Sequence, residues 1–380
     1  MIKNIPVAEP DLSGNEMKYI TDCVQSSWIS SKGEYIELFE KGFARFVGTK
    51  YAVSTSNGTT ALHLALHALG IGKNDEVIVP DLTFIATANT VIYTGAKPVV
   101  VDVERNTWNI DPTDIIKKIT KRTKAIIVVH LYGHPANMEK IEEIAQKYHL
   151  LIIEDAAEAH GAEIRMKNIE SGIKNREYIW KKVGSIGKVG CFSFYGNKII
   201  TCGEGGMVTT NDEMLVKKMK ILRDHGQTPN RRYFHEVIGF NYRMTNVQAA
   251  IGLAQLERIN QFIEKKRQIA FKYSSQLKKI KGITVPPSEN WAKSVFWMYS
   301  LLIDKPFPLN RDQVMQLFEK HGIETRPFFI PLHKMPPYKR NNIYPISEYL
   351  SKHGVNLPSS VTLNDKCIDK IITLLKSINQ

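Results

Sequence analysis

Short, continuous apolar runs alternate with stretches of helical spacing along the first half of this 380-residue chain. Between two of these runs, Leu62, Leu66 and Leu69 recur at the spacing of one helix face. Strands that are apolar on both faces are typical of parallel sheets, which helices cover on each side. We therefore predict an α/β protein with a mostly parallel central sheet between helices. The runs assigned to this sheet are residues 51–55, 76–79, 98–103, 125–129, 150–153 and 189–194.

The pattern changes near residue 262, and the length of the chain is sufficient for two structural units. We predict a large α/β domain over residues 1–262 and a smaller α+β domain over residues 263–380. The N-terminal segment is a candidate to pack on the smaller domain. That domain is expected to hold helices at 264–279, 312–321 and 364–378 and a strand at 297–303.

The composition is typical of a soluble globular protein, with 43% hydrophobic and 23% charged residues. The net charge of +13 comes from lysines spread along the chain, which indicates a solvated surface rather than a nucleic-acid interface. No apolar run could span a bilayer and no signal-peptide pattern is present, so a cytoplasmic protein without membrane contact is expected. The four cysteines lie far apart, so neither a disulfide framework nor a metal site is expected.

Lys198 lies between an apolar run and the glycine-rich segment 203–206. Burial disfavours the ammonium form of a lysine and lowers its pKa, and a neutral amine can form a Schiff base with a carbonyl group. The glycines would let a bulky cofactor approach the backbone. The alternative is a surface lysine after an edge strand, and this segment alone does not decide between the two.

Pyridoxal 5'-phosphate (PLP) needs an amine anchor, a partner for its pyridine nitrogen, a phosphate cradle and a ring to stack on. Asp155 ends an apolar run and is the candidate partner for the nitrogen. Ligands of open α/β sheets bind beyond the carboxyl ends of the strands, so Asp155 and Lys198 would share one crevice. The alternative role of Asp155 is to cap a following helix.

The segment 54–59 lies between a predicted strand and a predicted helix, where free backbone N–H groups and the helix dipole favour an anion. Gly58 would allow a phosphate to approach closely, and Thr59 would add a hydroxyl group. The sequence of this segment is equally consistent with an ordinary helix N-terminus capped by Asn57 or Thr59. Phe84 is the candidate for stacking on the cofactor ring, with a place in the core as its alternative.

Ordered motifs along nearly the whole chain carry a resemblance to a known family. They lie at residues 28–33 (WISSKG), 56–59 (SNGT), 76–80 (EVIVP), 82–87 (LTFIAT), 130–135 (HLYGHP), 154–159 (EDAAEA), 193–198 (SFYGNK), 203–207 (GEGGM), 239–245 (GFNYRMT) and 325–327 (TRP). With these motifs the sequence resembles the fold-type I PLP-dependent aminotransferases. Within them, it is most similar to the sugar-nucleotide aminotransferase family named for the DegT, DnrJ, EryC1 and StrS proteins.

The resemblance implies a role for each candidate residue around the cofactor. Lys198 would hold PLP as a Schiff base and would move a proton during transamination. Asp155 would pair with the pyridine nitrogen, and Glu158, where many relatives carry Gln, would lie near the ring hydroxyl. The phosphate would be held by Gly58, Thr59 and Ser193.

The resemblance also implies contacts farther from the cofactor ring. Asn241 would reach the phosphate from a partner subunit, so a homodimer with shared active sites is expected; the alternative is an ordinary turn residue. The candidates for contact with the sugar or its diphosphate are Lys32, Arg326 and His333, each with the alternative of an ordinary surface polar group.

The implied reaction is transamination of a nucleotide-linked 4-keto-6-deoxyhexose, with glutamate as the amino donor. The product would be a 4-amino-4,6-dideoxyhexose of the GDP-perosamine or the UDP- or dTDP-viosamine type, used in glycan biosynthesis. Alternatives are another keto sugar nucleotide, with a 3-keto or acetamido sugar, or a non-catalytic regulator of the same fold. Sugar 3-dehydratases of this fold carry His in place of the anchoring lysine, so Lys198 argues against that reaction.

The chain departs from its relatives in three places. The lysine-rich stretch 165–183 is longer than the usual short turn, and we expect a loop that is either a neutral insertion or part of the site mouth or dimer interface. Gly187-Lys188 stands where relatives commonly have Gly-Asp, and Ser294 stands where many have His. These departures concern the sugar and the nucleotide rather than the chemistry of the lysine.

Overall fold

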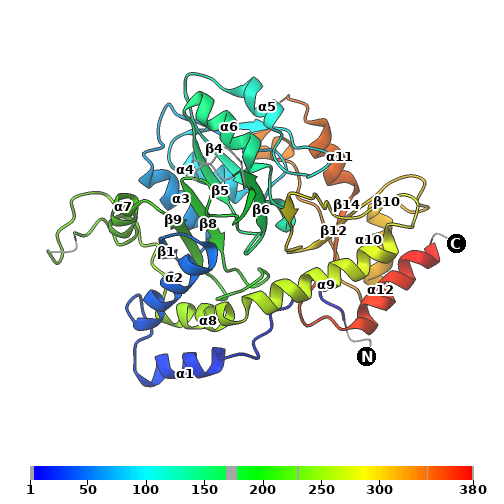
Figure 1. The fold of residues 1–380 in the computed structure, drawn as a ribbon, viewed down its shortest axis with the longest axis horizontal. Helices are drawn as coiled ribbons and strands as arrows, with labels where there is room; N and C mark the ends of the chain where they lie inside the picture. Colours follow the sequence, from blue (N-terminus) through cyan, green and yellow to red (C-terminus); the bar gives the residue numbers. More distant parts are fainter. Residues whose placement is uncertain (1–3, 168–177, 229–230, 340, 379–380) are drawn as a thin grey trace.

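The computed structural model of the protein describes residues 4–167, 178–228, 231–339 and 341–378 (Figure 1). Its centre is a seven-stranded sheet in the order β1-β9-β8-β5-β4-β2-β3. β9 is antiparallel to both neighbours, and the other strands run parallel to one another, so the predicted mostly parallel sheet is confirmed. The strands are β1 (Tyr51–Thr55), β2 (Glu76–Pro80), β3 (Lys97–Val101), β4 (Thr123–Val129), β5 (Leu151–Asp155), β8 (Val189–Ser193) and β9 (Gly206–Thr210).

Helices cover both faces of the sheet because successive apolar side chains of each strand point to opposite sides. In β2, Val77 and Val79 pack into the cluster formed with α3, α4 and α7, whereas Ile78 packs with α5 and α6 on the other face. On that second face α2 lies near β1 and is backed by α8 and α1 (Figure 1). These helices are α1 (Glu16–Gln25), α2 (Glu34–Val47), α3 (Gly58–Ala68), α4 (Ala86–Tyr93), α5 (Pro112–Lys118), α6 (Met138–Tyr148), α7 (Glu213–Arg223) and α8 (Asn246–Glu257).

β9 is the strand of the central sheet that the sequence patterns do not predict. It begins at Gly206, directly after a glycine-rich segment that reads as a loop. A Cβ atom at Gly206 would lie only 2.2 Å from the carbonyl oxygen of Asn57. The glycine is therefore required by the close approach of β9 to the start of α3, and its presence does not mark the end of regular structure.

A second, smaller unit follows α9 (Ile259–Leu277), which crosses the lower part of Figure 1 as one continuous helix. The predicted division between residues 262 and 263 falls inside this helix, and the division into two domains stays a prediction. The N-terminal segment lies on the smaller unit, where Ile5 forms a parallel bridge with Ile323. The unit contains an antiparallel sheet in the order β10-β12-β14-β13: β10 (Ile283–Thr284), β12 (Tyr299–Ile303), β13 (Arg326–Pro327) and β14 (Gly354–Leu357), with α10 (Arg311–Lys320), α11 (Pro345–His353) and α12 (Asp365–Ile378).

The stretch 165–183 is not the loop that its composition suggests. Its ends belong to the antiparallel strands β6 (Glu163–Lys167) and β7 (Tyr178–Lys182), and β11 (Ala292–Lys293) pairs with β6 on the other side. Ile164 and Met166 alternate with less buried residues and pack under the central sheet, a pattern hidden by the surrounding lysines. The middle of the stretch, residues 168–177, lies outside the described residues.

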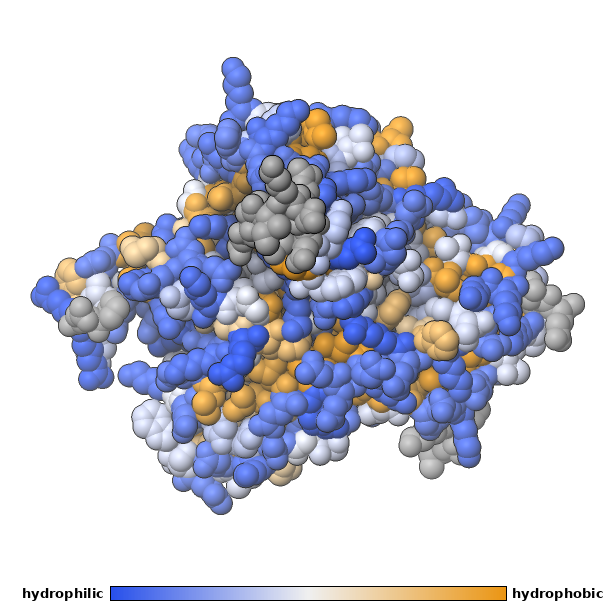
Figure 2. Space-filling model, in the orientation of Figure 1, coloured by the Kyte–Doolittle hydropathy of each residue, from blue (hydrophilic) through white to orange (hydrophobic). Residues whose placement is uncertain are grey.

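The face of the molecule seen in Figure 2 is mostly hydrophilic, with a hydrophobic area below its centre. Several large apolar side chains remain exposed, among them Trp28, Ile29 and Phe84. Exposed apolar groups of this size are candidates for contact with a ligand or a partner. Among the helices in the described part of the chain, none is long and apolar enough to cross a membrane.

Candidate active site

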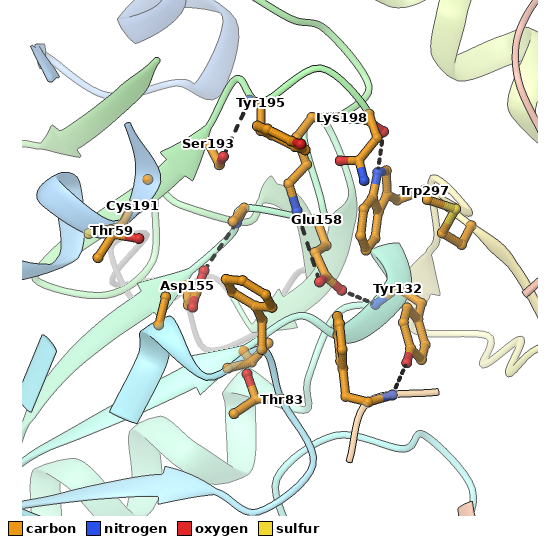
Figure 3. A pocket seen from close by; sticks show the side chains of 18 of the residues that line it. Thr59, Thr83, Tyr132, Asp155, Glu158, Cys191, Ser193, Tyr195, Lys198 and Trp297 are labelled. Carbon is orange, nitrogen blue, oxygen red and sulfur yellow. Dashed lines mark hydrogen bonds and ion pairs between the residues drawn. The ribbon is translucent and has the colours of Figure 1, made fainter. Parts of the chain in front are cut away.

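A cavity of about 440 Å³ lies beyond the carboxyl ends of the parallel strands, the edge where the sequence predicts ligand binding (Figure 3). Val129, Asp155 and Ser193 contribute from the ends of β4, β5 and β8, and Trp297 closes the opposite side from the smaller unit. The cavity is therefore built by both units. The predicted site residues that line it are Gly58, Thr59, Phe84, Asp155, Glu158, Ser193, Lys198 and Arg326.

Lys198 does not end β8 itself but lies in the turn after it, where its amide donates to the carbonyl of Tyr195. The Nζ atom is 4.0 Å from Oε1 of Glu158 and 3.9 Å from the ring centre of Trp297, and the side chain is only 12% exposed. Burial lowers the pKa of Lys198, and the negative charges of Glu158 and Asp155 raise it less, so the net shift is downward. The amine is thus more easily deprotonated than an ordinary lysine.

Asp155 is buried at the end of β5 with its carboxylate beside the cavity. Its Oδ2 accepts a hydrogen bond from Thr87 Oγ1 at 2.7 Å, and its Oδ1 accepts one from the Ala157 amide at 3.3 Å. Burial raises the pKa of Asp155 above its ordinary value, and these hydrogen bonds and the charge of Lys198 oppose only part of that rise. The next regular element among the described residues is β6, so Asp155 does not cap a helix.

Glu158 connects Lys198 to the wall of the site (Figure 3). Its Oε2 accepts a hydrogen bond from the Tyr132 amide at 2.8 Å, while Oε1 faces the lysine. Burial raises the pKa of Glu158 to about 7, and the positive charge of Lys198 acts in the opposite direction. Near neutral pH this carboxyl group can therefore both hold and release a proton.

The first turn of α3 forms the anion-binding end of the cavity. The side chain of Asn57 caps the helix by accepting from the Thr60 amide, which excludes Thr59 as the cap. The amides at the first helical positions have no acceptor within the helix, and the helix dipole adds positive potential there. A Cβ atom on Gly58 would lie 2.7 Å from Cβ of Ser193, so a larger residue would push the cradle apart.

Two further predicted residues stand at the cavity wall. Phe84 is 56% exposed, with its ring 5.9 Å from that of Phe329, so the alternative of a core position is wrong. Arg326 enters from β13 with its side chain 42% exposed and one ion pair, to Glu324 at 3.5 Å. An accessible guanidinium beside a cavity is suited to a phosphate or a carboxylate.

Three of the predicted residues do not line this cavity. Asn241 is exposed and accepts hydrogen bonds from the Arg243 side chain, and Lys32 is exposed in the loop before α2. His333 is only 3% exposed and lies between Asp81, at 2.7 Å, and Glu348, at 3.2 Å. His333 is thus neither a surface group nor a cavity residue, because the neighbouring carboxylates draw it into the junction between the units.

The structure also brings in residues that the sequence reasoning did not select. Thr87 and Tyr132 lie within two of the family motifs, but their contacts with Asp155 and Glu158 depend on the fold. Trp297 is far from Lys198 in the sequence, and no spacing rule could join them. The buried position of Ser294, whose hydroxyl donates to the Gly133 carbonyl at 3.0 Å, is likewise a tertiary feature.

Comparison with known proteins shows which family has this arrangement of residues. The sequence profile of the DegT/DnrJ/EryC1/StrS aminotransferase family matches residues 10–376. The chain belongs to this family. The GDP-perosamine synthase of Caulobacter vibrioides is 47% identical over 380 residues, covering 99% of each chain. The GDP-perosamine synthase of Escherichia coli O157:H7 is 45% identical, covering 100% of this chain and 99% of the relative.

Solved structures of the family agree with the fold. Streptococcus pneumoniae Spr1654 in its pyridoxamine phosphate form is 27% identical with a TM-score of 0.90, covering 99% of this chain and 98% of that chain. The same protein has also been solved in its PLP form. The predicted family, the fold-type I architecture and the PLP-dependent aminotransferase class are therefore confirmed.

The residues present fit PLP. The buried carboxylate of Asp155 suits a protonated ring nitrogen, and the exposed ring of Phe84 leaves a face for stacking. The cradle at Gly58 and Ser193 leaves no room for a further side chain and adjoins the free amides of α3. Among the described residues, no three His, Cys, Asp or Glu side chains gather where they could hold a metal ion.

Proposed function

We propose that this enzyme transfers the amino group of glutamate to the keto carbon of a GDP-linked 4-keto-6-deoxyhexose. The product would be a 4-amino-4,6-dideoxyhexose of the perosamine type, used in glycan biosynthesis. The observation that carries the proposal is identity of 45–47% with two GDP-perosamine synthases over essentially the full length of both chains. The cavity that contains Lys198, Asp155 and Glu158 supplies the groups that such a transfer requires.

Bound PLP would draw electrons from the carbon that loses a proton and would carry the amino group from donor to acceptor. We propose that Asp155, oriented by Thr87, pairs with the ring nitrogen of the cofactor. Gly58, Thr59 and Ser193 would hold the phosphate at the first turn of α3, and Phe84 would cover the ring. The same cavity is lined by Asp155, Gly58, Thr59, Ser193 and Phe84.

Lys198 is the group proposed to anchor the cofactor and to move the proton. Because burial lowers its pKa, the free amine loses its proton more easily than an ordinary lysine and can take up a proton and return it. Glu158, 4.0 Å away, has its pKa raised to about 7 and can share that proton near neutral pH. The pair thus keeps a proton available at the amine of Lys198.

Some of the predicted substrate residues would touch the substrate, and others would act on it through a neighbouring residue. Arg326 is proposed to bind the diphosphate, because its guanidinium is accessible at the cavity wall. His333 is proposed to act on the site through Asp81, whose loop leads to Phe84, rather than by touching the sugar. Lys32 stays a predicted substrate contact without a place in this cavity.

We propose that the active unit is a homodimer in which Asn241 completes the site of the partner subunit. Asn241 is exposed and does not line the cavity of its own chain, and the exposed Trp28 and Ile29 offer apolar surface for a second copy. Lys198→Ala and Asn241→Asp variants should each be nearly inactive alone. Mixed in equal amounts, they should recover about a quarter of the wild-type activity, because half of the dimers would contain one intact site.

Failure of the mixed variants to recover activity, despite demonstrated subunit exchange, would contradict the shared site. The shared site would also be contradicted if sedimentation at the assay concentration showed a monomer and the enzyme were fully active at that concentration. The cytoplasmic location stays a prediction.

The nucleotide and sugar can be tested directly. Enzyme loaded with ¹⁵N-labelled glutamate would be freed of donor and mixed separately with GDP-, UDP- and dTDP-linked 4-keto-6-deoxyhexoses. We expect mass spectrometry to show one labelled nitrogen in the GDP-linked sugar. Its rate of labelling should exceed that of the other two sugars at least about tenfold, because a hydrogen bond made to one nucleotide base and not to another gives at least that much discrimination. Faster labelling of the UDP- or dTDP-linked sugar would replace the perosamine assignment with the viosamine type.

A further inference from the structure

Lys266, on α9, is a buried lysine that the proposed reaction does not use. It is 6% exposed, and its Nζ donates to the backbone carbonyls of Trp297 at 2.9 Å and Ser359 at 2.7 Å. None of the ion pairs formed among the described residues includes it, and burial lowers its pKa to about 7. Burying the amino group of this lysine costs desolvation free energy. In return, its hydrogen bonds hold two backbone segments together.

One of these segments is the wall of the active site. The indole Nε1 of Trp297 donates to the carbonyl of Asn197 at 2.7 Å, and its ring centre lies 3.9 Å from Nζ of Lys198 (Figure 3). The residue whose carbonyl is bound by Lys266 therefore covers the predicted cofactor anchor. It also fixes the turn immediately before that anchor.

The backbone of Trp297 is also confined on its other side. A Cβ atom on Gly133 would lie 2.8 Å from the Trp297 amide nitrogen, so the two segments are in tight contact. The ring of Tyr132 stacks beside the indole, with an interplanar angle of 21°. With the Gly133 segment on one side and Lys266 on the other, the position of the indole depends on both contacts.

We propose that Lys266 is a positioning residue of the aminotransferase site, which holds the face of Trp297 against the amine of Lys198. An aromatic face attracts an ammonium group and excludes water from it, so this contact sets both the place and the charge of the amine. The inference concerns the lysine itself and does not depend on which keto sugar is bound.

The surroundings of Lys198 fix the direction of the expected effect. Glu158 and Asp155 attract its positive charge, and His160 is buried with its pKa lowered to about 3 and is therefore neutral. The face of the Trp297 ring adds a further attraction for the ammonium group. If the ring moves away while the site stays dry, the protonated form of the nitrogen loses a partner, and its pKa falls.

The test compares Lys266→Met, Trp297→Leu and the double variant in the PLP-loaded enzyme. The absorption of the cofactor bound to Lys198 changes with pH, and the midpoint of this change reports the protonation of that nitrogen. Lys265→Met, a loss of one ammonium group at the adjacent position of the same helix, is the matched control. We expect both single variants to lower the midpoint and the double variant to lower it no further than Trp297→Leu.

Turnover supplies a second readout. We expect kcat to fall about tenfold in Lys266→Met and KM for glutamate to change less than about twofold. A misplaced amine at Lys198 would slow the reaction steps but would leave the binding of glutamate almost unchanged. Lys266→Gln, which keeps a donor for the carbonyls, should lie between Met and wild type, and it serves as the test if Lys266→Met does not fold. A midpoint that is unchanged or raised in the Lys266 variants would overturn the proposal. Additive shifts in the double variant would also overturn it.

Discussion

At the scale of single residues, burial brings Lys198 and Glu158 closer in proton affinity. It lowers the pKa of the lysine and raises that of the carboxyl group from 4.5 to about 7. The folded protein therefore favours the protonated form of Glu158. The stability that this form contributes is present below pH 4.5 and is lost as the pH rises through about 7.

The same shift predicts a pH dependence of activity. The carboxylate form of Glu158 can accept a proton from Lys198, so kcat should rise with pH through about 7. Glu158→Gln cannot ionise, and its profile should lose this rise while the plateau rate stays within about tenfold of wild type. Profiles of kcat between pH 5.5 and 9 would decide. A rise near pH 7 that persists in Glu158→Gln would assign it to another group.

Thr87 predicts a second effect at this scale. Thr87→Val keeps the shape of the side chain but removes the 2.7 Å hydrogen bond to Asp155 Oδ2, leaving that oxygen with one partner fewer. We expect kcat to fall by roughly 10- to 100-fold, because a misplaced carboxylate no longer meets the ring nitrogen. Thr87→Ser should retain most of the activity.

Thr90→Val is the matched control for this prediction, because Thr90 is buried in the same helix and its hydroxyl donates to the backbone carbonyl of Thr87 rather than to the carboxylate of Asp155. Equal losses in the Thr87 and Thr90 valine variants would indicate a general defect of α4.

At the scale of elements, the start of α3 is defined by two neighbouring residues with different tasks. Asn57 caps the helix through a capping box with Thr60, and Gly58 makes the close contact with Ser193. An alanine in the first turn of a helix normally does no harm, and in a helix interior it stabilises relative to glycine by about 1 kcal/mol. At Gly58, however, an alanine would clash with Ser193, because its Cβ atom would lie 2.7 Å from the Cβ atom of Ser193.

Gly58→Ala should therefore weaken PLP binding by roughly 10- to 100-fold, since the shift opens the phosphate cradle and misaligns its donors. Equilibrium titration of the apoprotein with PLP, followed by absorption, measures this loss. Gly72→Ala is the control, because its nearest contact would be an ordinary 3.7 Å. PLP affinity equal to wild type in Gly58→Ala would show that the phosphate lies elsewhere.

The elements show what the sequence can and cannot predict. The parallel strands were predictable because their apolar runs are continuous, as in β4, where every residue but one is buried. β9 and the β6–β7 pair were not, because glycines and lysines hide the alternation along short strands. Asp155, Glu158 and Lys198 follow from motifs, whereas Trp297 and Lys266 enter only through packing between distant segments.

At the scale of the whole molecule, the two units meet at the cavity, and the smaller one supplies Trp297 and Arg326. Arg326 brings an accessible guanidinium to the cavity, so we expect it to act in binding the nucleotide sugar. Arg326→Ala should raise KM for the nucleotide sugar by roughly 10- to 100-fold with little change in kcat, as expected for loss of a charged contact to phosphate.

Lys320→Ala removes an exposed cation from the same unit and should leave KM unchanged, which controls for a general loss of positive charge. If Arg326→Ala slows transfer without raising KM, the guanidinium acts on the reacting groups instead of on the diphosphate.

Lys198 is proposed to anchor the cofactor in this cavity. Borohydride reduction of the PLP-loaded enzyme would fix the cofactor to the amine that holds it, and peptide mass spectrometry would locate that amine. We expect one labelled peptide, containing Lys198, and no covalent label in Lys198→Ala. A label on any other lysine, or none in the wild-type enzyme, would contradict it.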